Sequence, residues 1–155
     1  MHQDTQYLTK EKYKELQDEL DQLKKVRRKE VAEQLEYAKK LGDLSENAEY
    51  HEAREEQAEV EDRISHIDNI LKTAQILADR QGDTAGMGST VHVQKSGDSE
   101  VKVYKIVGSE EADMTAGKIS NVSPIGAALI GKKKGDKVEV KTPKGSSLYT
   151  LVSIG

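Results

Sequence analysis

Apolar residues in the first half of the chain recur with helical spacing in two runs of similar length. Most of the steps are three or four residues long, which is typical of the seam of a coiled coil. The first run comprises Tyr13, Leu16, Leu20, Leu23, Val26, Val31, Leu35, Ala38 and Leu41, and the second comprises Tyr50, Ala53, Val60, Ile64, Ile67, Leu71, Ala74 and Leu77. The spacing predicts two helices, the first over residues 9–40 and about 45 to 50 Å long.

The two runs are mirror images about residues 44 and 45. If the chain folds back there, facing residues have numbers that sum to 90 or 91, as for Tyr13 with Leu77, Val31 with Val60 and Leu41 with Tyr50. The pattern therefore predicts an antiparallel two-helix coiled coil over residues 1–78. Thr9, with Glu11 in the first turn, is a suitable helix start, and residues 1–8 are expected to be a frayed lead-in.

The pattern changes after residue 78. Residues 79–88 are rich in Gly and lack periodicity, so they are interpreted as a linker. Residues 89–155 then alternate apolar and polar positions in short runs, with Pro124 before and Gly131 after one short helical run. The strands are expected over residues 90–95, 101–107, 118–122, 137–142 and 147–154, and the helix over 125–130. We predict an α+β chain, with a long coiled coil followed by a small antiparallel-sheet domain carrying one short helix.

Composition supports this division. Of 155 residues 34% are charged and 4% aromatic, with no Trp or Phe, so any globular core is modest and a two-helix rod accounts for the charge. The absence of Cys excludes disulfides and thiolate metal sites. No segment resembles a signal peptide or a membrane span, so we expect a cytoplasmic protein with no membrane partner. The net charge of −4 argues against coating nucleic acid by bulk electrostatics.

Two carboxylates lie in the break between the predicted helices. Asp43 and Glu46 are three residues apart, so their oxygens could converge on one hard cation such as Mg²⁺. Two carboxylates at the end of a rod would hold that ion only weakly, unless another protein's active site supplied further ligands. The same spacing also matches a capping box, in which Asp43 accepts from the Glu46 amide. From the residues alone, both readings stay open.

Basic residues occur on both sides of this break. Lys24, Lys25, Arg27, Arg28 and Lys29 form a patch on the first helix, Lys39 and Lys40 precede the break, and Lys132, Lys133, Lys134 and Lys137 form a basic turn. Such patches are usually solvated faces. Arg54 differs, because it stands alone among the acidic residues of the second helix.

Residues 42–57, which read GDLSENAEYHEAREEQ, resemble the signature of the GreA/GreB family of bacterial transcript cleavage factors. SPIG and ALIG within residues 123–131, the Gly-Asp pair at 135–136 and TPKG at 142–145 resemble the C-terminal domain of that family. The resemblance spans nearly the whole chain. It implies an FKBP-like fold for residues 89–155.

The resemblance also implies a function. Such factors bind RNA polymerase through the globular domain and insert the coiled coil into the secondary channel, and the polymerase then cuts the 3′ end of a backtracked RNA. Carried over by position, Asp43 and Glu46 assist the second catalytic Mg²⁺ of the polymerase, while Arg54 and Lys39 contact the RNA 3′ end. Ser123, Pro124 and Ile125 match a segment that docks on a coiled coil of the polymerase. No cofactor is implied for the protein alone, which would not be an enzyme.

Three positions depart from the family pattern. Lys39 stands where many relatives have Arg, Lys29 replaces a common Pro, and Val122 replaces Asp or Asn just before the docking segment. The Lys39 change keeps the charge but loses bidentate phosphate geometry.

Other classes of function fit parts of the sequence. A binding module could occupy the polymerase channel without cleavage, or act as a coiled-coil chaperone, although intact Asp43 and Glu46 argue against a channel blocker. A prolyl isomerase is suggested only by fold, and Tyr104 and Tyr149 can hardly form its aromatic pocket. The His51-Glu52 pair is an incomplete metalloprotease motif.

Overall fold

The computed structural model describes residues 6–78 and 82–155, which divide into two compact units. Tyr13–Thr73 form one unit, and the residues up to Lys12 together with Ala74–Gly155 form the other. These boundaries differ from the expected ones, which lay after residue 78 and after residue 88. In the region interpreted as a linker, residues 79–81 lie outside the described residues, whereas Ala85 is buried in the core of the globular unit.

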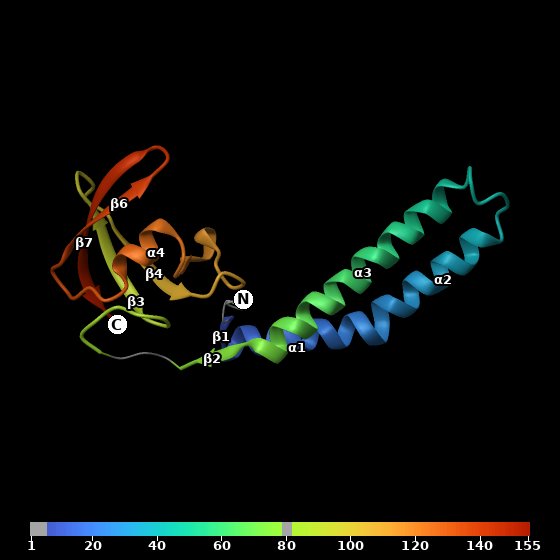
Figure 1. Cartoon of the computed structure of the whole chain (residues 1–155), viewed down its shortest axis with the longest axis horizontal. Helices are drawn as coiled ribbons and strands as arrows, with labels where there is room; N and C mark the ends of the chain where they lie inside the picture. The colour runs from blue at the N-terminus through green and yellow to red at the C-terminus, as the bar shows by residue number, and fades with distance from the viewer. Residues whose placement is uncertain (1–5, 79–81) are drawn as a thin grey trace, which may run out of the picture. The chain divides into compact units, whose positions relative to one another are not determined.

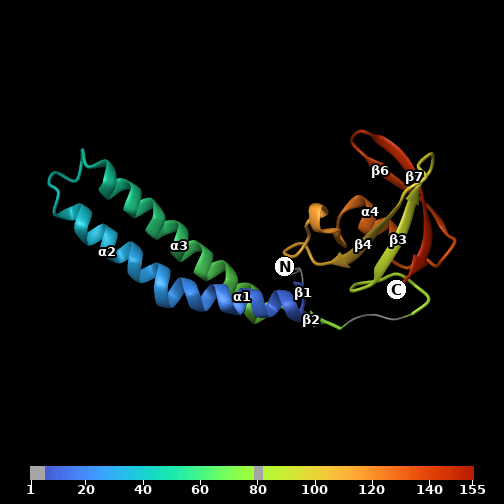
Figure 2. The same ribbon diagram turned by 180° about the vertical axis from the view of Figure 1, so that it is seen from behind.

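The first unit is a helical hairpin (Figures 1 and 2). Its elements are α1 (Lys10–Gln22), the π-helix η1 (Leu23–Arg27), α2 (Arg28–Lys39) and α3 (Ala48–Thr73). The returning helix α3 runs alongside α2 in both views, which confirms the predicted antiparallel pair. No helix in the described part of the chain is both long and apolar enough to cross a bilayer.

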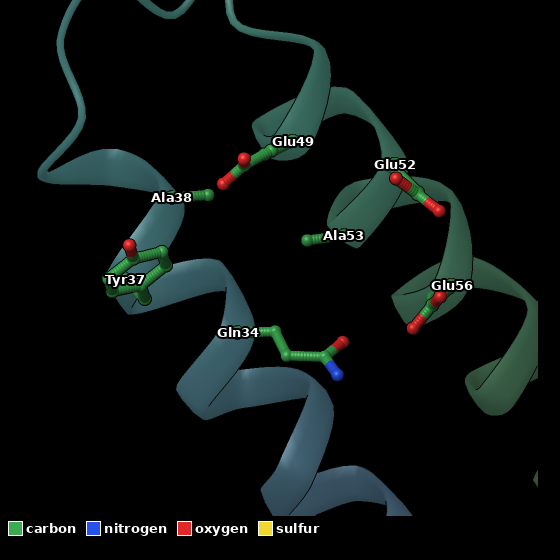
Figure 3. A pocket seen from close by; sticks show the side chains of 7 residues that line it. All are labelled: Gln34, Tyr37, Ala38, Glu49, Glu52, Ala53 and Glu56. Atoms are coloured by element: carbon green, nitrogen blue, oxygen red, sulfur yellow. The ribbon is translucent and has the colours of Figure 1, made fainter.

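The seam of the hairpin follows the predicted register in its middle. Val31 packs with Val60 and Ile64 in one buried cluster, which Leu20 and Leu23 partly cover. Figure 3 shows Ala38 and Ala53 facing each other nearer the tip, and both are buried.

The register was predicted wrongly toward the other end of α3, where Ile70 rather than Leu71 is buried. Val26 was also expected in the seam but is 40% exposed. It lies in η1, whose wider turns change the direction in which successive side chains point. The next residue, Arg27, points toward α3, where its guanidinium donates to Glu56 at 3.0 Å.

The globular unit is built on a five-stranded sheet in the order β5-β4-β3-β7-β6. Its elements are β3 (Thr90–Lys95), β4 (Val101–Val107), the short 3₁₀-helix η2 (Met114–Ala116), β5 (Lys118–Ser120), α4 (Pro124–Leu129), β6 (Lys137–Thr142) and β7 (Gly145–Ile154). The α+β class and the single α-helix of this unit are confirmed. The sheet is mixed rather than antiparallel, because β4 and β5 pair in parallel.

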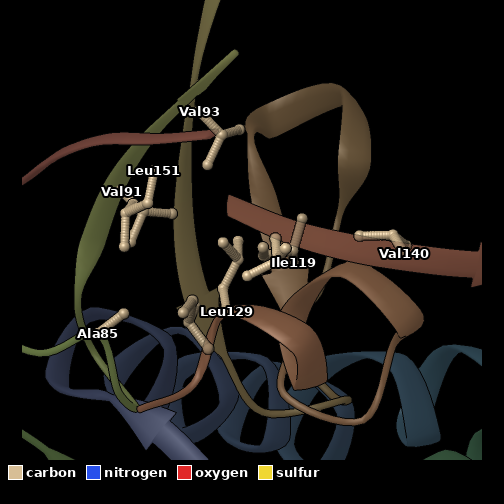
Figure 4. Packing of buried hydrophobic residues seen from close by; sticks show 9 residues of the cluster. Ala85, Val91, Val93, Ile119, Leu129, Val140 and Leu151 are labelled. Carbon is tan, nitrogen blue, oxygen red and sulfur yellow. The ribbon is translucent and has the colours of Figure 1, made fainter. Parts of the chain in front are cut away.

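The core of this unit lies between the sheet and α4. Leu129 of α4 lies among the side chains of the strands, including Ile119 of β5 and Val140 of β6 (Figure 4). Val91 and Val93 alternate with less buried residues along β3, as a strand with one face on the core requires. The alternation that predicted β3 and β6 therefore reflects real burial, whereas in β4 Val101 and Val103 are exposed.

Two short strands at the ends of the hairpin sequence were not predicted. β1 (Tyr7–Thr9) pairs in parallel with β2 (Gln75–Leu77), so the lead-in is not frayed over residues 7–9 and α3 ends before Leu77. Residues 1–5 of the predicted lead-in lie outside the described residues. Leu8 is fully buried, and the Thr9 hydroxyl accepts from the Lys12 amide at 3.2 Å, which confirms Thr9 as the helix cap.

Thr9 is also bonded to a distant buried carboxylate. Glu111 accepts from the Thr9 amide at 3.1 Å and from its hydroxyl at 2.7 Å, and Lys118 Nζ lies 3.6 Å from the second Glu111 oxygen. The Glu111 side chain is 1% exposed. This network attaches β1 to the segment that follows β4, within the globular unit.

Candidate functional site: the acidic tip loop

Asp43 and Glu46 lie in the loop of residues 40–47 that joins α2 to α3, here called the tip loop. Both side chains belong to exposed residues. Gly42 makes the turn possible, because its φ of +127° is a conformation that other residues rarely adopt. The structure therefore brings the two predicted acids together on one exposed loop.

Asp43 is held by its neighbour Ser45. Its Oδ1 accepts from the Ser45 amide at 3.0 Å and from the Ser45 hydroxyl at 2.9 Å. The backbone bond is the larger of the two effects that hold the pKa of Asp43 below its ordinary value. An Asp side chain is ionised at neutral pH in any case, and these bonds keep Asp43 ionised in more acidic solution as well.

This arrangement predicts that Ser45→Ala raises the pKa of Asp43 back toward its ordinary value. Hydrogen bonds stabilise the charged carboxylate, so removing the hydroxyl donor favours the protonated form. An NMR titration of the side-chain carboxyl carbons measures the pKa of Asp43 in the wild type and in the variant. Asp113, which Thr115 bonds in the same way, is the internal control. An unchanged Asp43 pKa would show that the Ser45 hydroxyl does not bond Asp43 in solution.

The capping-box alternative is wrong. Helix α3 begins at Ala48, after both acids, and its cap is Asn47, whose Oδ1 accepts from the Tyr50 amide at 3.2 Å. Asp43 bonds Ser45 rather than the Glu46 amide. Within the described residues, Glu46 makes no hydrogen bond or ion pair. Both carboxylates are thus left with oxygens that can bind a further group.

Sequence reasoning missed Asn47 as a residue of this site. Its Nδ2 donates to the Ala38 carbonyl at 2.6 Å, so one side chain caps α3 and bonds the end of α2. The signal was present, because Asn immediately before a helical run is a preferred cap. Leu41 was expected to pack on Tyr50, yet it is 51% exposed, and the Tyr50 ring instead meets His51 edge-on.

The tip loop alone does not form a complete metal site. Leu41, Asp43, Glu46, Asn47, Ala48 and Glu49 line an open hollow at this end of the hairpin. Throughout residues 6–78 and 82–155, no group of three or more His, Cys, Asp or Glu side chains is arranged to hold a metal ion. The donor set nevertheless suits Mg²⁺, which is bound through one or two carboxylates, with waters and phosphates as its other ligands.

A second hollow lies beside the tip loop, between α2 and α3. Figure 3 shows its residues, with Gln34 and Tyr37 on α2 and three glutamates on α3. Its lining comprises Gln34, Tyr37, Ala38, Glu49, Glu52, Ala53 and Glu56. The α3 side of the hairpin is therefore strongly acidic next to the tip, as the sequence indicated.

Arg54 and Lys39 are both exposed, one in the second turn of α3 and the other at the last residue of α2. The described residues include no hydrogen-bond or ion-pair partner for Arg54. The basic patch differs, because Arg28 donates to Glu61 at 2.8 Å and Lys25 lies 2.9 Å from Asp21. These pairs fit the interpretation of the patch as a solvated face.

Ser123, Pro124 and Ile125 form the start of α4. The Ser123 hydroxyl accepts from the Gly126 amide at 3.1 Å and donates to the Ser120 carbonyl at 2.6 Å, while Pro124 occupies the first turn. Val122 precedes this cap and is 71% exposed. The predicted docking segment is therefore the capped first turn of a helix, with an exposed apolar residue before it.

Two parts of the chain match the two halves of one family. Residues 6–76 match the family described as "Transcription elongation factor, N-terminal", and residues 80–155 match "Transcription elongation factor, GreA/GreB, C-term". The boundary between the two matches falls close to the end of β2.

Curated relatives cover nearly the whole chain. The chain is 49% identical to transcription elongation factor GreA of Bacillus licheniformis, over 91% of this chain and 90% of that protein. It is 45% identical to GreA of Clostridium acetobutylicum, over 99% of each chain. Among solved structures, GreA factor homolog 1 of Thermus thermophilus is 31% identical over 97% of this chain and 98% of that chain, with a TM-score of 0.44. The chain therefore belongs to the GreA/GreB family of transcription elongation factors.

Proposed function

We propose that this protein binds RNA polymerase, places its tip loop in the polymerase active site through the secondary channel, and stimulates cleavage of the 3′ end of backtracked RNA. The observation that carries the proposal is the state of Asp43 and Glu46. They are two exposed carboxylates on the loop at one end of a long hairpin, and neither takes part in capping the helix that follows.

Asp43 and Glu46 would act as ligands that complete a metal position within the polymerase. A second Mg²⁺ bound there would help to activate water and to stabilise the charge that develops on the cleaved phosphate. Asp43 contributes an ionised oxygen oriented by Ser45, and Glu46 contributes a carboxylate with no competing partner among the described residues. The protein supplies ligands to the enzyme and is not the enzyme itself.

Arg54 and Lys39 would contact the 3′ end of the extruded RNA. A guanidinium without an acidic partner can donate to phosphate oxygens in a bidentate manner, whereas the ammonium of Lys39 offers only a point charge. Ser123, Pro124 and Ile125 would hold the globular unit on the polymerase, because a capped turn presents the same surface in the free and bound protein.

Replacing Arg54 with Ala is expected to slow stimulated RNA cleavage about 10-fold, since a lost charge-assisted hydrogen bond costs roughly that factor. Arg54→Lys should be intermediate, because it keeps the charge but not the fork of donors. Lys72→Ala is the matched control, since it removes one positive charge from α3 at a site remote in sequence from the tip loop. Equal cleavage rates for Arg54→Ala and Lys72→Ala would show that Arg54 does not contribute to cleavage.

A backtracked bacterial RNA polymerase complex with labelled RNA tests the proposed function directly. Addition of this protein with Mg²⁺ should release a short 3′ fragment, and transcription should then resume from the new end. Binding and competition for the channel without any cleavage would favour the alternative of a channel-occupying module. Absence of both binding and cleavage would overturn the proposal.

An isomerase function gains no support from the globular unit. Tyr104 and Tyr149 pack against the core and line a small hollow whose other residues are Val93, Lys95, Asp98, Glu100 and Lys102. A proline-binding site needs an apolar, largely aromatic wall. This hollow has a mostly charged wall instead.

A further inference from the structure

Asn47 is the point at which the tip loop is attached to both helices of the hairpin. Its Nδ2 donates to the Ala38 carbonyl, in the last turn of α2, and its Oδ1 accepts from the Tyr50 amide, in the first turn of α3. The two distances are 2.6 and 3.2 Å. Asn47 follows Ala38 by nine positions, and Asp43 and Glu46 lie between them.

Other bonds attach the tip loop to one helix at a time. The amides of Lys40 and Leu41 donate to carbonyls at the end of α2 at 3.1 Å, and His51 Nε2 of α3 lies 3.5 Å from the Ser45 carbonyl. Asn47 is partly buried, whereas all the other residues of the loop are exposed. Leu41 and Leu44 are 51% and 40% exposed, so no apolar side chain of the loop is buried against the hairpin. The bonds between Asp43 and Ser45 lie within the loop and set its local shape, but they do not attach it to a helix.

The chemistry at position 47 demands more than a helix cap. Ser, Thr and Asp cap helices about as well as Asn, because each supplies an acceptor oxygen. Of these four cap residues, only Asn supplies an acceptor oxygen and a nitrogen donor together. A carboxylate at this position would face the Ala38 carbonyl with a second acceptor, and a serine hydroxyl is too short to make both bonds.

We propose that Asn47 is a positioning residue for the acidic pair. By attaching the end of α2 to the start of α3, it sets where Asp43 and Glu46 stand relative to the hairpin that carries them. This inference rests on the proposed function of the pair. It adds that ligand placement depends on the bond from Asn47 to Ala38, and not only on the presence of the two acids.

The test uses the full chain in the backtracked-complex assay, with Asn47→Ser as the principal variant. Serine keeps the cap and adds no charge but loses the bond to Ala38. Asn69→Ser is the matched control, because Asn69 is an exposed residue of α3 remote in sequence from the loop. Three quantities are measured: the maximal cleavage rate at saturating protein, the Mg²⁺ concentration for half-maximal rate, and the affinity for polymerase.

We expect Asn47→Ser to lower the maximal rate about 10-fold or more, as small displacements of catalytic ligands do. It should also raise the Mg²⁺ requirement, so that added Mg²⁺ restores part of the rate, while polymerase affinity and helix content by circular dichroism stay unchanged. Asn47→Asp, which can also cap α3, should not recover wild-type cleavage. Asn69→Ser should match wild type in every measurement.

Three results would overturn the inference. Cleavage by Asn47→Ser that equals that of Asn69→Ser at every Mg²⁺ concentration would show that capping alone suffices, and so would wild-type cleavage by Asn47→Asp. A loss of cleavage that only parallels lost affinity or helix content would show a purely structural role. If Asp43→Asn itself cleaves normally, the metal-ligand role of the pair is wrong, and the failure then lies with the proposed function.

Discussion

Asp43→Asn and Glu46→Gln are each expected to lower the maximal rate of stimulated RNA cleavage on the order of 100-fold, which corresponds to the loss of a few kcal/mol of transition-state stabilisation. An amide oxygen is a poor substitute for a charged ligand of Mg²⁺. Asn at position 43 retains an oxygen that can accept from Ser45, so the shape of the tip loop is preserved. The expected loss therefore reports on charge and metal binding.

Both variants should still bind polymerase and compete with the wild-type protein for it, because the residues proposed to dock lie in the globular unit. Glu52→Gln is the matched control, since it removes one carboxylate from an exposed position on the first turns of α3 outside the tip loop. The measurement is single-turnover cleavage of labelled RNA over a range of Mg²⁺ concentrations. Variants that cleave as fast as Glu52→Gln would exclude the two acids as ligands.

Glu111→Ala is expected to destabilise the globular unit by about 2 to 4 kcal/mol, because it leaves buried donors of Thr9 without an acceptor. The midpoint of thermal unfolding should fall by about 10 °C. Glu111→Gln should cost less, since one oxygen remains to accept from Thr9. Calorimetry measures the midpoint, and amide hydrogen exchange at Leu8 and Thr9 reports whether β1 is released.

An exposed carboxylate provides the control for this prediction. Glu100→Ala removes an exposed carboxylate from the same unit and should change the midpoint little, as surface substitutions usually do. If Glu111→Ala proves no more destabilising than Glu100→Ala, the bond between Thr9 and Glu111 contributes nothing to stability.

Most of the hairpin could be predicted because its signal is local and repeated. Each apolar residue three or four positions from the next adds to one helix face, so errors at single positions such as Val26 do not change the outcome. The strands β3, β4 and β6 were predicted with correct bounds for a similar reason, since alternation over six or seven residues needs no knowledge of the partner strand. The parallel pairing of β4 with β5 required that knowledge and was missed.

The sequence predicted that Asp43 and Glu46 lie in the break between the two helices, but it did not predict the role of Asn47 or the bonds within the loop. Asp43, Ser45 and Asn47 are all residue types that cap helices, and they lie within five positions of one another. The local sequence pattern cannot show which of the three caps α3, because this depends on the position of the end of α2 relative to the start of α3. Asn47 is the cap in the structure, where its amide also reaches Ala38, and this leaves Asp43 and Glu46 exposed for another role.

The sequence by itself determined that this protein has an antiparallel helical hairpin, an acidic loop at its turn and a small α+β unit, because periodicity, turn residues and charge act over short stretches of chain. Only the tertiary structure decided that Thr9 bonds Glu111 across 102 positions, and that three-residue strands join the ends of the hairpin sequence. Such contacts leave no repeated pattern in either segment. They form because folding brings buried donors and acceptors together, where each would be costly to leave unpaired.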